Sequence, residues 1–355
     1  MKQGSFPDNW KVAKLVLIDK PKKSHNEQTK YRPICLINVI AKTYESLLNT
    51  RLTQELEKSG GLNKNQHGFI PGRTTIDAIG EVVLAAKKAK ADNKWNSLIL
   101  VDVRNAFNTA TWSIIIKKLK SRNINEYVLN VIIDYLTNRY IQLERNVRVE
   151  VTGGVPQGSV LGPTLWNVLY DDVMDTEAPE GVKLVCYADD LAISVTASDA
   201  HEMMVKANET LHAVVLWMRQ NKLEIAPEKT EAVIFHRKKN AHRIYFDCGG
   251  IMVAPSTSVT YLGVKLDSQL NYGPHIKTLE ILALKIRGLR FVRNGNIFIR
   301  IPYLKRKKEL LISSSSCSTH RRLTTENGSP LRVRRVLAIV YHAGHVWIGR
   351  LDTPL

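Results

Sequence analysis

Two adjacent carboxylates, Asp189 and Asp190, are the residues whose type and spacing point most clearly to chemistry. They lie in the middle of residues 184–195, between two apolar runs of strand length, and this pattern predicts a β-hairpin with the acidic pair at its bend. Adjacent carboxylates raise each other's pKa unless a cation lies between them. Hard oxygen ligands suit Mg²⁺, which usually takes one or two protein carboxylates together with substrate phosphates. The alternative is a solvated surface turn, because Asp favours turns.

A third candidate carboxylate, Asp102, ends the short apolar run over residues 97–102. A continuous apolar strand indicates burial on both faces, so an acid at its end is well placed to act at the edge of a sheet. The alternative is that Asp102 caps the turn that follows it. A shared site requires this strand and the hairpin over residues 184–195 to meet in one sheet.

Two loops rich in glycine and proline contain further candidate site residues. Residues 153–159 are the most concentrated turn signal, where glycine would let a backbone or a ligand approach closely and Ser159 can cap the next helix. The alternative is a simple loop before a core helix. In residues 66–75 we expect His67 to be a hydrogen-bonded structural histidine, and Arg73 to be either a solvated loop charge or a phosphate contact.

Apolar spacing predicts the elements that must position these residues. Helices are expected over residues 37–56, 75–90, 111–120, 126–136, 161–173 and 204–218, the second of them capped by Thr74 or Thr75. Strands are expected over residues 10–19 and 261–267, with a hairpin over 141–151 and a turn at 226–230 between two extended pieces.

The bulk composition is that of a globular, basic chain of 355 residues with a net charge of +18, which favours a polyanionic partner such as nucleic acid. Much of the excess lies in residues 287–352, with fourteen basic and three acidic side chains. No apolar run reaches membrane-span length, and the N-terminus lacks the apolar core of a signal peptide. The four cysteines have no paired spacing, which argues against a zinc site or a disulfide framework.

Several of these signals stand in a fixed order and together resemble the reverse transcriptase of non-LTR (LINE-type) retrotransposons, over residues 10–275. They are Arg32-Pro33-Ile34, Gly68-Phe69 with Gly72, Asp102 with Ala106-Phe107, Pro156-Gln157-Gly158 and Tyr187-Ala188-Asp189-Asp190. The spelling of residues 102–108 and 223–232 is similar to the branch that inserts into ribosomal RNA genes of arthropods. Ile70 departs from the Arg often found at its position.

The resemblance implies an α+β right-hand polymerase with an antiparallel palm sheet flanked by helices. The reverse transcriptase domain would cover residues 1–275, with fingers over about 10–95 and the palm over 96–275. Residues 276–310 would form a partial, thumb-like segment. We expect residues 311–355 to be a basic tail that is disordered or frame-disrupted, so that the chain is a partial copy of the element.

The resemblance also implies roles for matching residues. Asp102, Asp189 and Asp190 would bind metal together with the backbone carbonyl of Val103, and Lys229 would protonate the pyrophosphate leaving group. The nucleotide would be bound by Arg32, by the aromatic steric gate Phe107, and by Gln157 and Gly158. The contacts to nucleic acid would come from Arg73, Gly154 and Pro156.

The implied activity is RNA-directed DNA synthesis from dNTPs on an RNA template and a DNA primer, in the nucleus and without a membrane partner. Two Mg²⁺ ions about 4 Å apart, or Mn²⁺ as a substitute, can activate the primer 3′-oxygen and stabilise the leaving oxygen. A catalytically inactive relic that at most binds nucleic acid is the alternative. An RNA-templated RNA polymerase is a third reading, against which Phe107 argues because an aromatic gate clashes with a ribonucleotide.

Overall fold

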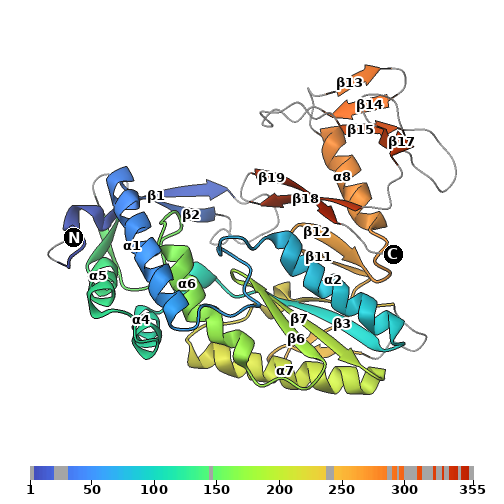
Figure 1. Ribbon diagram of the computed structural model, residues 1–355, viewed down its shortest axis with the longest axis horizontal. Coiled ribbons are helices and arrows are strands. Elements are labelled where there is room, and N and C mark those ends of the chain that lie inside the picture. Colours follow the sequence, from blue (N-terminus) through green and yellow to red (C-terminus); the bar gives the residue numbers. More distant parts are fainter. Residues whose placement is uncertain are drawn as a thin grey trace. The chain divides into compact units, whose positions relative to one another are not determined.

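Figure 1 shows the computed structural model of the chain, which describes residues 4–19, 31–143, 147–236 and 244–285. Beyond residue 285 it describes only strand segments, without their side chains. The chain divides into two units, residues 1–256 and residues 257–355. Each unit is described by itself.

The first unit is built on a four-stranded antiparallel sheet in the order β6-β7-β3-β8. Its strands are β3 (Trp95–Val101), β6 (Val182–Tyr187), β7 (Asp190–Ala197) and β8 (Glu231–Phe235). Helices α2 (Thr75–Ala91) and α7 (Ala200–Gln220) cover its two faces (Figure 1). Two covered faces explain why most residues of β3 and β7 are buried without alternation, and the predicted sheet flanked by helices is confirmed.

The covering helices begin where the sequence places good capping residues. Thr74 and Asp77 form a capping box, in which the Asp77 carboxylate accepts from the Thr74 N–H at 2.7 Å. Asp199 accepts from the N–H of Glu202 at 2.9 Å at the start of α7. The predicted start of the helix after Thr74 is therefore confirmed.

A second group of helices packs beside this sheet in the same unit. Helix α4 packs against α5 and α6, and α1 packs against α5. Their bounds are α1 (Val39–Lys58), α4 (Trp112–Ser121), α5 (Glu126–Leu136) and α6 (Gly162–Tyr170). Shorter helical segments are η1 (Asp8–Trp10), α3 (Ala106–Thr109), η4 (Asp171–Asp175) and η5 (Pro227–Lys229). The helix predicted over residues 161–173 thus continues as η4 after α6 ends.

A smaller, mixed sheet in the order β2-β1-β4-β5 lies in the segment predicted to form the fingers and in the hairpin that returns to it. Strand β1 pairs antiparallel with β2 and parallel with β4. The strands are β1 (Val12–Asp19), β2 (Tyr31–Leu36), β4 (Arg139–Gln142) and β5 (Arg148–Val151). A short pair, β9 (Phe246–Asp247) and β10 (Met252–Val253), completes the unit. Within the described part of the chain, every helix is too short or too polar to cross a membrane.

The second unit corrects one prediction. The single strand expected over residues 261–267 is wrong, because the segment spans a hairpin between β11 (Ser258–Tyr261) and β12 (Val264–Asp267). Leu262 and Gly263 have φ values of 47° and 82°, and a two-residue turn of this kind reverses the chain. Helix α8 (Gly273–Lys285) packs against β12.

The rest of the second unit consists of strand segments. Strands β13, β14 and β15 form one sheet, and β16 pairs with β17 and β18 with β19. Their bounds are β13 (Arg290–Arg293), β14 (Asn296–Ile299), β15 (Leu310–Ser313), β16 (Leu323–Thr324), β17 (Pro330–Leu331), β18 (Val336–His342) and β19 (His345–Leu351). The parts of the predicted thumb-like segment and of the predicted tail that lie between these elements are outside the described residues, and the predicted domain boundaries stay predictions.

Candidate active site

The three predicted carboxylates come together at one end of the first unit's main sheet. Val101, the last residue of β3, pairs with Leu191 of β7, so continuing this antiparallel register by one residue sets Asp102 opposite Asp190. Asp189 lies in the two-residue turn between β6 and β7. Residues far apart in the sequence therefore meet at one sheet end, as a shared site requires.

Asp190 is the carboxyl most affected by this gathering. Loss of water to the surrounding protein, and then the charges of Asp189 and Asp102, raise the pKa of Asp190 to about 7. Asp190 keeps an exposed surface, so water screens part of this effect, while burial and the like charges beside it both raise the pKa. A cation bound among these carboxylates would reverse the shift.

The backbone carbonyl of Val103 is a further oxygen at the sheet end where the carboxylates meet. In the bridge between Val103 and Ile225, the carbonyl of Asp102 accepts from Ala226 and the N–H of Arg104 donates to the opposite chain, both at 2.8 Å. Successive carbonyls of an extended chain alternate in direction. The carbonyl of Val103 is therefore directed away from Ile225, toward the side of β7.

Lys229 lies beside the first of the carboxylates. Its Nζ is 3.1 Å from Oδ2 of Asp102, and both side chains reach solvent, with 57% and 35% of their surfaces exposed. Segment η5, which carries Lys229, is tied to the end of β3 by Arg104, whose Nη2 lies 3.2 Å from both carboxylate oxygens of Glu228. Exposed ion pairs stabilise a fold little, but this one places an ammonium group beside Asp102.

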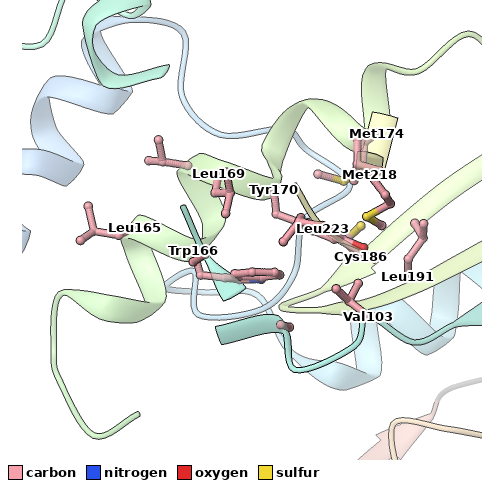
Figure 2. Packing of buried hydrophobic residues seen from close by; sticks show 14 of the residues in the cluster. Val103, Leu165, Trp166, Leu169, Tyr170, Met174, Cys186, Leu191, Met218 and Leu223 are labelled. Carbon is pink, nitrogen blue, oxygen red and sulfur yellow. The ribbon is translucent and has the colours of Figure 1, made fainter. Parts of the chain in front are cut away.

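Phe107, the predicted steric gate, is packed on a stack of aromatic rings. Its ring is stacked on Trp166 at a centroid distance of 5.3 Å and meets Phe69 edge-on at 6.1 Å. Trp166 in turn stacks on Tyr170 at 5.1 Å, and Figure 2 shows both residues projecting from α6 into the buried cluster. Trp166 and Tyr170 are fully buried, so they give Phe107 a rigid support.

The predicted nucleotide-binding loop is pressed against strand β2. The carbonyl of Gln157 accepts from the N–H of Cys35 at 2.8 Å. Gly158 has a φ of +113°, and a Cβ added to it would lie 2.7 Å from the carbonyl oxygen of Cys35. Only glycine fits this approach. The loop is thereby joined to the strand that carries Arg32, whose side chain lies outside the described residues.

Gly154 joins the same loop to the segment that carries the gate. Its φ is +81°, and a Cβ would lie 2.8 Å from the carbonyl oxygen of Asn108. The next residue, Val155, donates its N–H to the carbonyl of Phe107 at 2.7 Å. Pro156 is half-buried between these two attachments. Residues 154–158 are thus fixed at both ends, on the gate segment and on β2.

Glu45 is a buried residue behind the predicted nucleotide-binding loop that sequence reasoning missed. It is buried on α1, and its Oε2 accepts from the backbone N–H of Val160 at 2.6 Å and of Leu161 at 3.4 Å, just before α6. Burial raises the pKa of Glu45, and these hydrogen bonds lower it in part. The hydroxyl of Ser159 accepts from the N–H of Gly162, the first residue of α6, at 2.7 Å. The N-cap position itself is occupied by Leu161, so the prediction that Ser159 caps this helix is wrong in position. In the sequence, Glu45 is one charged residue of an amphipathic helix.

Arg73 and His67 both hold the loop over residues 66–75. Nη1 of Arg73 donates to three carbonyl oxygens at 2.5–3.0 Å, those of Asn63, Lys64 and Gln66. A contact between nucleic acid and the rest of this guanidinium stays a prediction. His67 is buried, with Nε2 3.3 Å from the carboxylate of Glu81, and burial lowers its pKa. Its burial fits the expected structural role, but neither ring nitrogen makes the expected hydrogen bond with good geometry.

Carboxylates at a strand end and at a hairpin turn of an antiparallel sheet are the arrangement of a nucleic-acid polymerase palm. Residues 19–266, more than half of the chain, match the family of reverse transcriptases (RNA-dependent DNA polymerases). The chain belongs to this reverse transcriptase family.

Relatives and solved structures agree with this assignment. The chain is 29% identical to the probable RNA-directed DNA polymerase from transposon BS of Drosophila melanogaster, covering 81% of this chain and 33% of the relative. It is 26% identical to the Pol polyprotein of retrotransposable element R1 of Bradysia coprophila, covering 80% and 28%. The predicted resemblance to non-LTR retrotransposons is confirmed, and the chain spans about a third of these relatives' length.

The fold is also that of solved polymerases. Telomerase from Candida albicans, in a complex with the TWJ fragment of telomeric RNA, superposes with a TM-score of 0.51 at 12% identity, covering 74% of this chain and 45% of the telomerase. Apo telomerase from Candida tropicalis gives a TM-score of 0.52 at 12% identity, covering 73% and 47%. At this identity the likeness concerns the fold alone, and the predicted polymerase fold is confirmed.

Proposed function

We propose that this domain is an RNA-directed DNA polymerase that adds dNTPs to the 3′-hydroxyl of a DNA primer on an RNA template. The observation that carries the proposal is the meeting of Asp102 with Asp189 and Asp190 at one end of one sheet, from segments far apart in the sequence. Family membership and the activity for which the relatives are named support it. Nuclear location stays a prediction from the family.

The donors at the sheet end fit Mg²⁺, with Mn²⁺ as a possible substitute. Asp102 and Asp189 would supply carboxylate oxygens, Asp190 lies beside them, and the carbonyl of Val103 is directed to the same side. All are hard oxygen donors, and burial together with the charges of Asp189 and Asp102 raises the pKa of Asp190, a shift that a bound cation would oppose. Within the described residues, no group of three acidic, histidine or cysteine side chains forms a ready cage, and Mg²⁺ commonly completes its shell with water and substrate phosphates. Such an ion, when bound, stabilises negative charge on the reacting oxygens.

The proton transfer is assigned to Lys229. Its ammonium group lies 3.1 Å from Asp102, beside the proposed metal-binding carboxylates, where the pyrophosphate leaving group would acquire charge. An ammonium group can give its proton to the leaving oxygen as the bond to the α-phosphorus breaks. The Arg104–Glu228 contact keeps η5, and with it Lys229, at this position.

The remaining residues would orient the substrates. Phe107, supported by Trp166, would face the ribose and exclude a 2′-hydroxyl, and Gln157 and Gly158 would contact the incoming nucleotide and the template. We assign the triphosphate to Arg32. Contacts to the nucleic acid are assigned to a further set, Arg73, Gly154 and Pro156.

A polymerase assay with matched substrates tests this proposal. A DNA primer is annealed to an RNA template and to a DNA template of the same sequence, and each duplex receives dNTPs or rNTPs with Mg²⁺, or dNTPs with EDTA. We expect extension on RNA with dNTPs and Mg²⁺, and none with EDTA. A folded protein that extends no primer but retains the RNA in a gel-shift assay would instead be an inactive relic that binds nucleic acid.

A further inference from the structure

The turn that carries Asp189 is held from outside its own hairpin by one buried amide. Gln66 is fully buried, and its Oε1 accepts from the N–H of Ala188 at 2.9 Å while its Nε2 donates to the carbonyl of Ala188 at 3.3 Å. Both backbone polar groups of the residue before Asp189 are therefore bound by the same side chain. The Oε1 of Gln66 also accepts from the N–H of Gly68 at 2.9 Å.

The turn needs such support because its first residue is strained. Ala188 has a φ of 59°, a left-handed conformation in which a side chain is unfavourable and which two-residue hairpins usually give to glycine. The backbone beside Gln66 adds two bonds to β6, since His67 donates to the carbonyl of Cys186 at 2.8 Å and Cys186 donates to that of Asn65 at 2.9 Å. Gln66 and Cys186 thus form a bridge at the end of the hairpin.

Close packing leaves the turn no room to move toward the loop. A Cβ on Gly68 would lie 2.1 Å from the backbone nitrogen of Ala188, so the two backbones are in direct contact. From the other side, Nδ2 of Asn167 on α6 donates to the carbonyl of Gly68 at 2.8 Å. Gly68 therefore lies between α6 and the turn and contacts both.

We propose that Gln66 is a positioning residue for the metal site: it fixes the Ala188 peptide groups so that Asp189 is presented toward Asp102. This inference rests on the proposed function, because it takes Asp189 as a metal ligand. Gln66 touches neither substrate nor metal and acts only through the turn. An amide is required, because the side chain must accept two hydrogen bonds and donate one.

Mn²⁺ binding, measured from the EPR signal of the free ion, tests the proposal without requiring catalysis. We expect Gln66→Met, which keeps the size but loses all three bonds, to weaken Mn²⁺ binding by about 10- to 100-fold, the usual effect of removing a residue that orients a ligand. Asn96→Met is the matched control, since Asn96 is a buried amide on β3 that donates to the carbonyl of Val195 at 3.2 Å and to the hydroxyl of Thr196 at 2.9 Å. It should bind Mn²⁺ as the wild type does. Equal binding by Gln66→Met and the wild type would overturn the proposal.

Gln66→Glu serves if the methionine variant fails to fold. It keeps the size and the two accepted bonds but loses the bond to the carbonyl of Ala188, so positioning predicts weaker Mn²⁺ binding. Its added negative charge alone would tighten binding, so an affinity equal to or above that of the wild type would contradict the proposal. Adding Ala188→Gly, which removes the strain of the turn, should restore part of the lost affinity to Gln66→Met.

The outcome for Asp189→Ala separates this inference from the proposed function. If the wild type and Asp189→Ala bind Mn²⁺ equally, the metal site itself is wrong. If only Asp189→Ala loses binding and Gln66→Met keeps it, the metal site stands and the role of Gln66 is wrong. In an active enzyme, Gln66→Met should lower kcat about tenfold or more, in line with the loss of bound metal, and leave the KM for dNTPs within about twofold.

Discussion

Nζ of Lys229 lies 3.1 Å from Oδ2 of Asp102, so the proposed acid for the leaving group forms an ion pair with a proposed metal ligand. A cation that binds Asp102 competes with the ammonium group for the same carboxylate. A cation bound at Asp102 would therefore free the Lys229 ammonium group to approach the triphosphate, so that the proton donor would become available when the metal site is filled. The pair is exposed, so it can open at little cost in stability.

Replacing Lys229 should separate metal binding from catalysis. Lys229→Met removes a positive charge that competes for Asp102, so Mn²⁺ binding should become tighter. It also removes the proton donor, so single-nucleotide incorporation should slow by about 10²-fold or more. Lys222→Met, at an exposed lysine just after α7, is the control and should change neither quantity. Slower incorporation together with weaker metal binding would contradict the competition between Lys229 and the metal.

The raised pKa of Asp190 makes the stability of the metal-free protein depend on pH. Its pKa in the folded protein, about 7, exceeds the value of about 3.9 expected in the unfolded chain. A carboxyl with a raised pKa contributes stability that is present below the unfolded value and is lost as the pH rises through the folded value. In urea titrations with EDTA, the free energy of unfolding of the wild type should therefore fall between about pH 4 and 7 relative to Asp190→Asn. Parallel profiles for the two proteins would contradict the shift.

Phe107 should set the preference for deoxyribonucleotides. Phe107→Ala should raise the ratio of kcat/KM for rNTPs to that for dNTPs by at least about tenfold, or about 1.4 kcal/mol of relative transition-state energy. Trp166→Leu removes the ring on which Phe107 stacks and should move the ratio in the same direction, by less. Trp217→Phe, in a tryptophan that contacts Tyr170 and not Phe107, should leave it unchanged. An unchanged ratio in Phe107→Ala would refute the gate assignment.

Glu45 should matter for stability because it binds the backbone before α6. Glu45→Ala leaves the N–H groups of Val160 and Leu161 without their buried acceptor, so we expect the free energy of unfolding to fall by about 1–3 kcal/mol in urea titrations. Glu57→Ala, at an exposed position of the same helix, should change it by less than about 0.5 kcal/mol. Equal changes in the free energy of unfolding for the two substitutions would show that the buried hydrogen bonds of Glu45 do not stabilise the protein.

The sequence predicted the parts of this site that lie in continuous motifs. The hairpin over residues 184–195, the strand that leads to Asp102 and the capped helix after Thr74 all depend on local pattern, and the structure has them. Of the acidic pair predicted at the bend, only Asp189 lies in the turn, because Asp190 is the first residue of β7. Residues that act across long sequence separations could not be found this way. Gln66 binds Ala188, 122 positions away, and no local pattern reveals that contact.

Local patterns also failed where a short turn interrupts an apolar run. Residues 261–267 read as one strand because Leu262 is apolar, yet its φ of 47° places it in a reversal with Gly263. Glu45 was missed for a different reason, because a charged residue on a helix is expected to face solvent. Its burial follows from the backbone N–H groups that it binds in another part of the chain.

Primer extension by the wild type beside Asp189→Ala tests the central claim most directly. Each protein receives a DNA primer on an RNA template, dNTPs and Mg²⁺, with Asp92→Ala, at the exposed C-terminal cap of α2, as the matched control. We predict extension by the wild type and by Asp92→Ala and none by Asp189→Ala. Extension by Asp189→Ala at the wild-type rate, or none by any of the three folded proteins, would contradict a working metal-dependent site at the end of this sheet.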